Sequence, residues 1–232
     1  MSFNAPDIVA ALSDLVGGLA VERWTVQLGD RCISGYGLRD AADLLDEPSF
    51  AREFVEQDRA PYWAQLWPAS LMLAEHVWAC PDGSGQSAIE LGCGLGLVSI
   101  AAALRGYVVT ASDYDRRALD FVRANASLNG VRSLQTAVLD WAAPVIDRTF
   151  DWVLAADVLY ERPNHAPLIS LISRLLTPSG VAIIADPNRP AAGDFGTELT
   201  RAGFGVQTRA TRTRQPGTAY VDGTLYIASR QA

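Results

Sequence analysis

One stretch of the sequence decides its fold: Ala88-Ile89-Glu90-Leu91-Gly92-Cys93-Gly94-Leu95-Gly96-Leu97-Val98-Ser99-Ile100-Ala101. A short apolar run ends on an acidic residue, three glycines then alternate with larger residues, and an apolar pattern at helical spacing follows. This order predicts a strand, a glycine-rich turn and a helix. Glycine permits positive φ and a close approach by a ligand, and the helix N-terminus offers free N–H groups. The turn therefore predicts a site for a nucleoside-type cofactor.

The spacing of the glycines separates two classes of cofactor. The dinucleotide fingerprint is G-x-G-x-x-G, but here the third glycine position is occupied by Leu97. The string E-L-G-C-G-L-G instead resembles motif I of the S-adenosylmethionine (SAM) methyltransferases with a Rossmann-like core. The alternative is an ordinary glycine-rich turn in another α/β protein, and residues further along the chain favour the first interpretation.

Length and composition indicate a globular protein. The chain has 232 residues, of which 49% are hydrophobic and 19% charged, enough for one sizeable core. We expect a single methyltransferase domain over residues 1–232, with 1–60 as an N-terminal helix and hairpin extension and 61–232 as the SAM-binding core. The formal net charge of −7 argues against a nucleic-acid partner.

Cysteine usage and the absence of targeting segments predict the compartment. Cys32, Cys80 and Cys93 are odd in number and form no C-x-x-C pair, so a disulfide framework and a metal site are both unexpected. The first residues lack the basic segment of a signal peptide, and no apolar run reaches membrane-spanning length. We expect a soluble cytoplasmic protein without a membrane partner. The sequence does not determine its oligomeric state.

Alternating strand and helix patterns predict the topology. Upstream of the glycine turn, we expect a helix over 7–19, a hairpin of 24–28 and 32–36, a helical acidic segment over 40–57 and a helix over 68–79. Strands are then predicted over 87–91, 107–111, 134–138, 151–155, 181–185, 205–213 and 219–228. Helices are predicted over 97–104, 115–128, 166–176 and 193–202, with a turn at 177–180. The expected fold class is α/β, with a doubly wound, mostly parallel, seven-stranded sheet and one reversed strand.

Acidic residues follow two of the predicted strands near the glycine turn. Ligands of doubly wound sheets bind at the carboxyl ends of the strands. Asp113 could there accept both ribose hydroxyls; its alternative role, capping the next helix, suits Asp115 better. Asp140 and Trp141 follow the third strand and could contact adenine, or they could be a turn aspartate and a buried ring.

The fourth strand ends on a second candidate pair. Asp157 could hold a substrate amine while Tyr160 packs against it, or the two could be a loop aspartate and a rim tyrosine. An aromatic segment precedes the sheet, and rings attract a sulfonium or an ammonium through cation–π interaction. We assign Trp67 to the cofactor and Trp63 to packing.

These signals occur together and in order, and the chain resembles the seven-β-strand protein-lysine methyltransferases marked by a D-x-x-Y motif. Asp157 and Tyr160 stand at the motif positions, and P-Y-W-A-x-x-W-P, L-D-W and A-D-V-L-Y-E are shared features. The segment Asp186-Pro187-Asn188-Arg189-Pro190 is similar to the D-P-G-R-P loop of the electron-transfer-flavoprotein β-subunit lysine methyltransferases, with Asn188 in place of glycine. The resemblance covers roughly residues 20–205.

The resemblance implies a SAM-dependent N-methyltransferase. Its acceptor would be a lysine of a protein such as the electron transfer flavoprotein β subunit; a small amine of the nicotinamide type, or SAM binding without catalysis, are the alternatives. The implied catalytic residues are Asp157 and Tyr160. The implied cofactor contacts are Trp67, Glu90, Gly92, Cys93, Gly94, Gly96, Asp113, Tyr114, Asp140, Trp141 and Ala156.

Four further features have less specific interpretations. Asn125 matches an asparagine common on the second helix of that group, and we expect a structural role for it. His165 follows Tyr160 closely enough to reach the site, whereas His76 fits a packed helix. The basic run Arg201, Arg209, Arg212 and Arg214 could protect a strand edge or dock an acidic partner.

Overall fold

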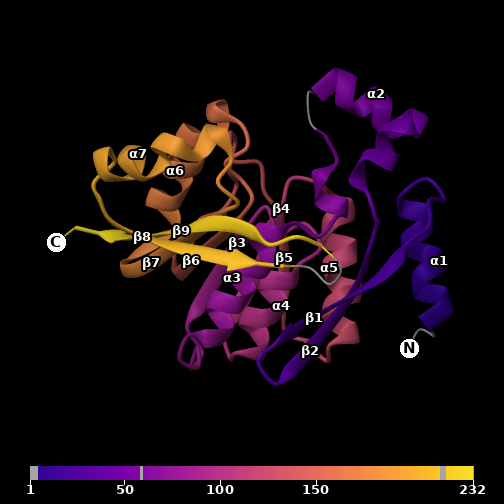
Figure 1. Cartoon of the computed structure of the whole chain (residues 1–232), viewed down its shortest axis with the longest axis horizontal. Coiled ribbons are helices and arrows are strands. Elements are labelled where there is room, and N and C mark those ends of the chain that lie inside the picture. Colours follow the sequence, from indigo (N-terminus) through magenta and orange to yellow (C-terminus); the bar gives the residue numbers. More distant parts are fainter. Residues whose placement is uncertain (1–4, 58–59, 215–217, 232) are drawn as a thin grey trace.

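Seven strands form one sheet in the computed structural model, which describes residues 5–57, 60–214 and 218–231 (Figure 1). The strand order is β5-β4-β3-β6-β7-β9-β8, and only β9 among the described strands of this sheet runs antiparallel to both its neighbours. The predicted doubly wound sheet with a terminal hairpin is confirmed. The strands are β3 (Ser87–Leu91), β4 (Val108–Asp113), β5 (Gln135–Val138), β6 (Phe150–Ala156), β7 (Leu176–Asp186), β8 (Phe204–Thr213) and β9 (Val221–Arg230).

Helices cover both faces of this sheet. On one face lie α3 (Pro68–Ala79) and α4 (Leu97–Leu104), and on the other α6 (His165–Leu175) and α7 (Phe195–Arg201) (Figure 1). Ala88 of β3 packs on the first side, whereas Ile89 and Leu91 pack on the second. Because both faces are covered, the central strands are almost continuously apolar. None of the helices in the described ranges is long and apolar enough to cross a membrane.

The order of the strands creates the place for a site. The chain leaves β3 toward β4 and β5, then returns so that β6 pairs with the other side of β3. Connections therefore diverge at the carboxyl ends of β3 and β6, which is where open α/β sheets bind their ligands. The glycine turn follows β3, and Asp157 follows β6.

The N-terminal extension is less regular than expected. It contains α1 (Ala5–Leu15), the hairpin of β1 (Glu22–Leu28) and β2 (Arg31–Gly37), a 3₁₀ turn η1 (Ala41–Asp46), and α2 (Pro48–Gln57). The helical segment predicted over 40–57 is thus divided in two. Asp40 caps η1 through the Ala42 N–H, and Pro48 begins α2, where its missing N–H costs nothing. A second 3₁₀ turn, η2 (Tyr62–Ala64), leads into α3.

Residues 177–180, where the predicted helix was expected to stop, lie within the bounds of β7 but outside its ladder with β6. Strand β7 begins at Leu176, directly after α6, and its pairing passes from Phe150–Leu176 to Trp152–Val181, so residues 177–180 have no partner on β6. The pairing with β6 shifts register between Phe150 and Trp152 to accommodate them. Gly180 permits this because a Cβ there would lie 2.9 Å from the Asp151 carbonyl oxygen. The helix predicted over 193–202 likewise divides into a 3₁₀ turn, η4 (Pro190–Asp194), followed by α7.

Two asparagines attach the hairpin to the sheet domain: one lies within α5 (Arg116–Leu128), and the other is the residue that caps its C-terminus. The Asn125 side chain accepts from the Tyr36 N–H at 2.7 Å and donates to the Tyr36 and Leu95 carbonyls at 3.1 and 3.0 Å. The Asn129 side chain makes the same pair of bonds with the backbone of Ser34. An amide side chain thus replaces the peptide groups of a neighbouring strand. Asn125 also links β2 to the glycine turn through Leu95.

Asn125→Ala is expected to lower the free energy of unfolding by about 2–3 kcal/mol, because buried backbone groups lose their partners. The Asn125 side chain is fully buried at 0% exposure. Urea unfolding followed by circular dichroism measures the change. Ser127→Ala, at an exposed position of the same helix, is the matched control and should stay within about 0.5 kcal/mol of wild type. Equal effects of the two substitutions would contradict the assigned role of Asn125.

Candidate active site

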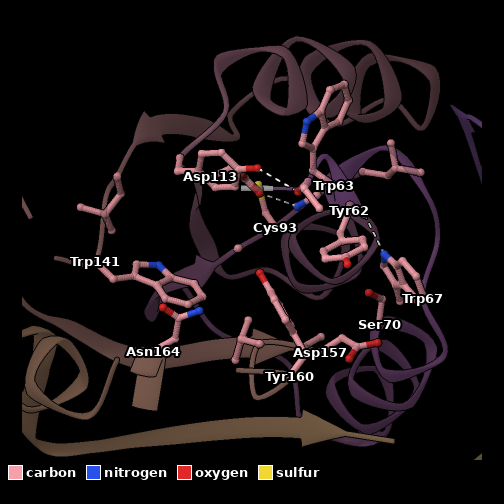
Figure 2. A pocket seen from close by; sticks show the side chains of 18 of the residues that line it. Tyr62, Trp63, Trp67, Ser70, Cys93, Asp113, Trp141, Asp157, Tyr160 and Asn164 are labelled. Carbon is pink, nitrogen blue, oxygen red and sulfur yellow. Dashed lines mark hydrogen bonds between the residues drawn. The ribbon is translucent and has the colours of Figure 1, made fainter. Parts of the chain in front are cut away.

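A cavity of about 400 Å³ lies at the carboxyl ends of the central strands (Figure 2). Every residue predicted for the site lines it, except Glu90. Residues from four parts of the chain meet there: the aromatic segment before α3, the glycine turn, the ends of β4 and β5, and the segment after β6. The predicted residues in the lining are Trp67, Gly92, Cys93, Gly94, Gly96, Asp113, Tyr114, Asp140, Trp141, Ala156, Asp157 and Tyr160.

The glycine turn is shaped by positive φ angles. Gly92, Gly94 and Gly96 have φ of 70°, 47° and 81°, values that side chains disfavour. A Cβ on Gly94 would approach the Trp63 carbonyl oxygen to 3.1 Å, and one on Gly92 would approach the Trp141 ring to 3.3 Å. The turn therefore keeps open a space that any larger residue would narrow.

Asp113 projects into the cavity from the end of β4. One carboxylate oxygen accepts from the Gly94 N–H at 3.0 Å and the other from the Asp115 N–H at 3.1 Å. Burial raises the pKa of Asp113 to about 6, although these backbone bonds oppose the rise. Each oxygen keeps a lone pair for another donor. The side chain can therefore accept from ligand hydroxyls at neutral pH, while Asp115 caps α5 by accepting from the Arg117 N–H.

Glu90 lies beneath the glycine turn and outside the cavity lining. Its carboxyl group accepts from the backbone N–H of Ser99 at 2.8 Å and also from the Ser99 hydroxyl, so it holds the first turn of α4. Burial raises the pKa of Glu90 to about 8. Glu90 therefore stabilises the start of α4, the helix that follows the glycine turn, and does not line the cavity. The sequence alone could not distinguish this structural role from contact with a ligand.

Glu90 is expected to make stability depend on pH. Its folded pKa of about 8 exceeds the ordinary value of 4.5, so the folded protein binds more protons between these values. The free energy of unfolding should therefore fall as pH rises from 6 to 8, by on the order of 1 kcal/mol per pH unit. Glu90→Gln should flatten this slope in urea unfolding at pH 6, 7 and 8. Identical slopes in both proteins would contradict the assignment.

Asp157 has an unusual backbone conformation directly after β6. Its φ is 58°, a left-handed value that Asp and Asn tolerate better than most residues. The side chain is 4% exposed and forms an ion pair between Oδ1 and the Arg189 guanidinium. Its Oδ2 atom is buried without a hydrogen-bond partner among the described residues. Such an atom is costly to bury unless a donor arrives, so Oδ2 is suited to accept from a ligand.

Three aromatic rings stand beside this carboxylate (Figure 2). Tyr62 contacts Tyr160 edge-on, with centroids 5.5 Å apart, and Trp67 in the same manner at 6.0 Å. Trp67 is held by its indole N–H, which donates to the Tyr62 carbonyl at 2.7 Å. Burial raises the pKa of Tyr160 to about 12, so its hydroxyl keeps its proton at neutral pH. The rings form a wall that can attract a cation.

Of the remaining candidates from the sequence, one lines the cavity and the two histidines do not. Trp63 packs against Phe121 as expected, and it also lines the cavity. His165 is outside the lining; its Nδ1 lies 3.0 Å from Glu198 and its ring contacts Phe195. His76 sits on α3, away from the cavity. No group of three or more His, Cys, Asp or Glu side chains that could hold a metal occurs in the described part of the chain.

Sequence reasoning missed several members of the site. Ser70 and Asn164 line the cavity without belonging to any recognised motif, and Glu161 lines it although the A-D-V-L-Y-E run that contains it gave it no role. Arg189 was quoted within the 186–190 loop, but its ion pair with Asp157 was not foreseen. The loop offered one signal: Asn188, where the similar loop has glycine, takes φ of 59°. Asparagine is among the residues that tolerate this conformation.

Comparison with known proteins identifies the family of this chain. A family described as lysine methyltransferase matches residues 53–198. The chain belongs to the lysine methyltransferase family. The match includes the aromatic segment, the glycine turn and every predicted site residue, and the prediction of a methyltransferase is confirmed at the level of the family.

Curated relatives of this family are about one third identical. The chain is 32% identical to mouse (Mus musculus) EEF1A lysine methyltransferase 3 over 56% of its own length, and 32% identical to mouse protein N-lysine methyltransferase METTL21A over 64%. The electron transfer flavoprotein beta subunit lysine methyltransferase of Danio rerio is 31% identical over 56% of this chain. The matches span 58%, 73% and 51% of those relatives.

Solved structures support the fold. The ribosomal protein L11 methylase from Lactobacillus delbrueckii subsp. bulgaricus superposes with a TM-score of 0.54 at 20% identity, covering 70% of this chain and 77% of that one. A TehB-like SAM-dependent methyltransferase from Corynebacterium glutamicum gives 0.52 at 16% identity, covering 80% of this chain and all of its own. At these identities the likeness shows the shared architecture alone.

The residues around the cavity fit SAM. The glycine turn leaves room for a ligand backed by the Trp63 carbonyl, and Asp113 presents acceptor lone pairs of the kind ribose hydroxyls need. Trp141 lies against the turn at Gly92, where its ring can cover a planar base. When bound, SAM supplies a methyl group on a positively charged sulfur.

Proposed function

We propose that this chain transfers a methyl group from SAM to the ε-amino group of a lysine in a protein. The observation that carries the proposal is the buried Asp157 Oδ2 atom, unpaired among the described residues, in the cavity that the glycine turn also lines. A carboxylate flanked by Tyr62, Trp67 and Tyr160 suits a cation on a long aliphatic stem. Family membership supports the same reaction.

We assign roles to the residues as follows. Asp113 holds the ribose, while the glycine turn, Asp140 and Trp141 surround the rest of the cofactor. Asp157 captures the lysine ammonium and aligns it, and Tyr160 and Trp67 exclude water around its stem. Free lysine has a pKa of about 10.4, so a proton must leave to water before the nitrogen can attack. The nitrogen lone pair then forms the new N–CH₃ bond as the C–S bond breaks.

The first candidate acceptor is the electron transfer flavoprotein β subunit. Two observations support it: the loop 186–190 is similar to that of its methyltransferases, and the zebrafish enzyme is 31% identical. The mouse EEF1A and METTL21A enzymes match equally well, so EEF1A is a second acceptor to test. The described cysteines Cys32, Cys80 and Cys93 are all free thiols, which supports our proposal of a cytoplasmic location.

Methyl-tritiated SAM tests the proposal. The purified chain is incubated with electron transfer flavoprotein, with EEF1A, with nicotinamide and with cell extract, and products are separated by gel and by chromatography. Label recovered as methyllysine in a protein band is the expected result. Label in a small amine alone would replace the proposed acceptor class, and SAM binding without any label would indicate a binding protein. Asp157→Asn serves as the control for background transfer.

A further inference from the structure

Two buried aspartates lie side by side at the ends of neighbouring strands. Ala156 of β6 pairs with Ala185 of β7, so Asp157 and Asp186 are the next residues on each strand. The Asp157 N–H donates to the Ala185 carbonyl at 2.9 Å, which keeps the two strand ends together. Asp186 is fully buried, and its Oδ2, like that of Asp157, has no hydrogen-bond partner among the described residues. Sequence reasoning gave Asp186 no role.

Arg189 bridges these carboxylates. Its backbone N–H donates to Asp186 Oδ1 at 2.7 Å, and its side-chain Nε donates to Asp157 Oδ1. The guanidinium carbon lies 5.5 Å from the centre of the Trp67 ring, and the side chain is 33% exposed. Arg189 does not belong to the cavity lining, whereas Asp157 does. The guanidinium therefore contacts Asp157 from outside the cavity.

The loop that carries Arg189 is anchored on the reversed strand. Asn188 adopts a left-handed conformation, and its Oδ1 accepts from the Thr224 hydroxyl of β9 at 2.8 Å. This turn aims the Arg189 N–H at Asp186 and places its side chain against Asp157. The bridge thus depends on the backbone path of residues 186–190.

The charges of the three side chains do not cancel. When both carboxyl groups are ionised, the two carboxylates and the one guanidinium have a net charge of −1, and both carboxyl groups are buried. Burial raises the pKa of Asp186, with the Asp157 charge adding to the rise and Arg189 opposing it. The ion pair with Asp157 raises the pKa of Arg189. Among the described residues, Arg189 and Tyr160 lie near Asp157, Arg189 and Tyr226 lie near Asp186, and Tyr62 lies near Arg189.

We propose that Arg189 is a positioning residue for methyl transfer: it binds Oδ1 of Asp157, separates the charges of Asp157 and Asp186, and leaves Oδ2 of Asp157 for the acceptor ammonium. The inference rests on the proposed function for the identity of that cation. The ion pair with Arg189 fixes the rotamer of Asp157, and the guanidinium charge favours the ionised form of the neighbouring Asp186. One incoming cation then completes the charge balance of the group.

Arg189→Met tests the proposal. The KM for the lysine acceptor should rise at least about tenfold, while the Kd for SAM stays within about twofold of wild type. The acidic limb of the pH profile of kcat/KM should move upward by about one pH unit, because two adjacent carboxylates without their cation share a proton. Arg162→Met, which removes an exposed ion pair with Asp194, is the matched control and should change neither quantity.

A second variant and a second readout keep the test decisive. Arg189→Lys retains the positive charge but lacks the planar guanidinium. The acidic limb of its pH profile of kcat/KM should therefore stay in place, while KM rises about threefold to tenfold. Carbon-13 NMR titration of the aspartate carboxyls in wild type and Arg189→Met, assigned with Asp157→Asn and Asp186→Asn, reads the bridge without any acceptor. One carboxyl should titrate about one pH unit higher in the variant.

The outcomes separate the two proposals. If wild type methylates no lysine but the carboxyl titration shifts, the proposed function fails and the role of Arg189 as the bridge between the two carboxyl groups stands. If wild type methylates lysine and Arg189→Met keeps its KM, its acidic limb and its carboxyl titration, the inference is overturned. An equal loss of SAM affinity and turnover would also overturn it. If Arg189→Met does not fold, an unchanged KM in Arg189→Lys would overturn the inference instead.

Discussion

Asp157→Asn is expected to keep SAM binding within about threefold of wild type and to lower kcat/KM for the protein acceptor at least about 100-fold. Asparagine tolerates the left-handed φ of 58° at this position, so the backbone path should survive. The substitution removes the negative charge that captures the ammonium. Misalignment of the nitrogen with the S–CH₃ bond then lowers the rate even when the acceptor binds.

Two measurements on the same protein check this expectation. Calorimetry gives the Kd for SAM, and transfer of labelled methyl groups to the acceptor gives kcat and KM. Asp157→Ala should lose at least as much activity, since alanine also strains at positive φ. Asp222→Ala, at an exposed position of β9, is the matched control. Full activity in Asp157→Asn, or a parallel loss of SAM affinity, would remove Asp157 from the acceptor site.

Asp113→Ala is expected to weaken SAM binding roughly 10- to 150-fold, which corresponds to about 1.5–3 kcal/mol for the loss of charged hydrogen bonds. The carboxylate is 3% exposed and lines the cavity. Burial raises its pKa to about 6, so it is ionised in an assay at pH 7.5 and loses its charge as pH falls through 6. SAM affinity should therefore also decline below pH 6 in wild type.

Two control variants accompany Asp113→Ala: one substitutes a neighbouring aspartate, and the other replaces Asp113 by asparagine, which has the same shape. Asp115→Ala removes the cap of α5 two residues away, so it should cost about 0.5–2 kcal/mol of stability without changing SAM affinity. Asp113→Asn keeps an oxygen for the Gly94 N–H, but it loses the charge and replaces the acceptor of the Asp115 N–H with an amide donor. An unchanged Kd in Asp113→Ala would mean that the ribose is bound by other groups.

Local patterns predicted the fold and twelve of the residues that line the cavity because their geometry follows from short stretches of chain. Strand ends of a parallel sheet share one edge, so Asp113 and Asp157 had to lie on the same side as the glycine turn. The glycines at 92, 94 and 96 needed positive φ, and the structure gives them that conformation. The roles assigned to these residues with a cofactor or an acceptor remain predictions.

Features that depend on contacts between distant parts of the chain could not be predicted from the sequence. Glu90 could be placed at the end of a strand, but not beneath the turn with Ser99. The partner of Asp157 is Arg189, 32 residues away, and their contact depends on Asn188 being held by Thr224. Pro178 and Gly180 gave a local turn signal, but that signal did not show that residues 177–180 interrupt the pairing of β7 with β6 between Leu176 and Val181.

The hydrogen bonds of Asn125 and Asn188 have a consequence for the minimal size of this protein. The family match ends at residues 53 and 198, yet Asn125 binds the hairpin before it and Asn188 binds β9 beyond it. A chain trimmed to the shared segment would leave both amide side chains facing solvent, one beside the glycine turn and one behind Asp157. The hairpin and β9, which lie outside the matched segment, therefore hold in place the glycine turn and the loop behind Asp157.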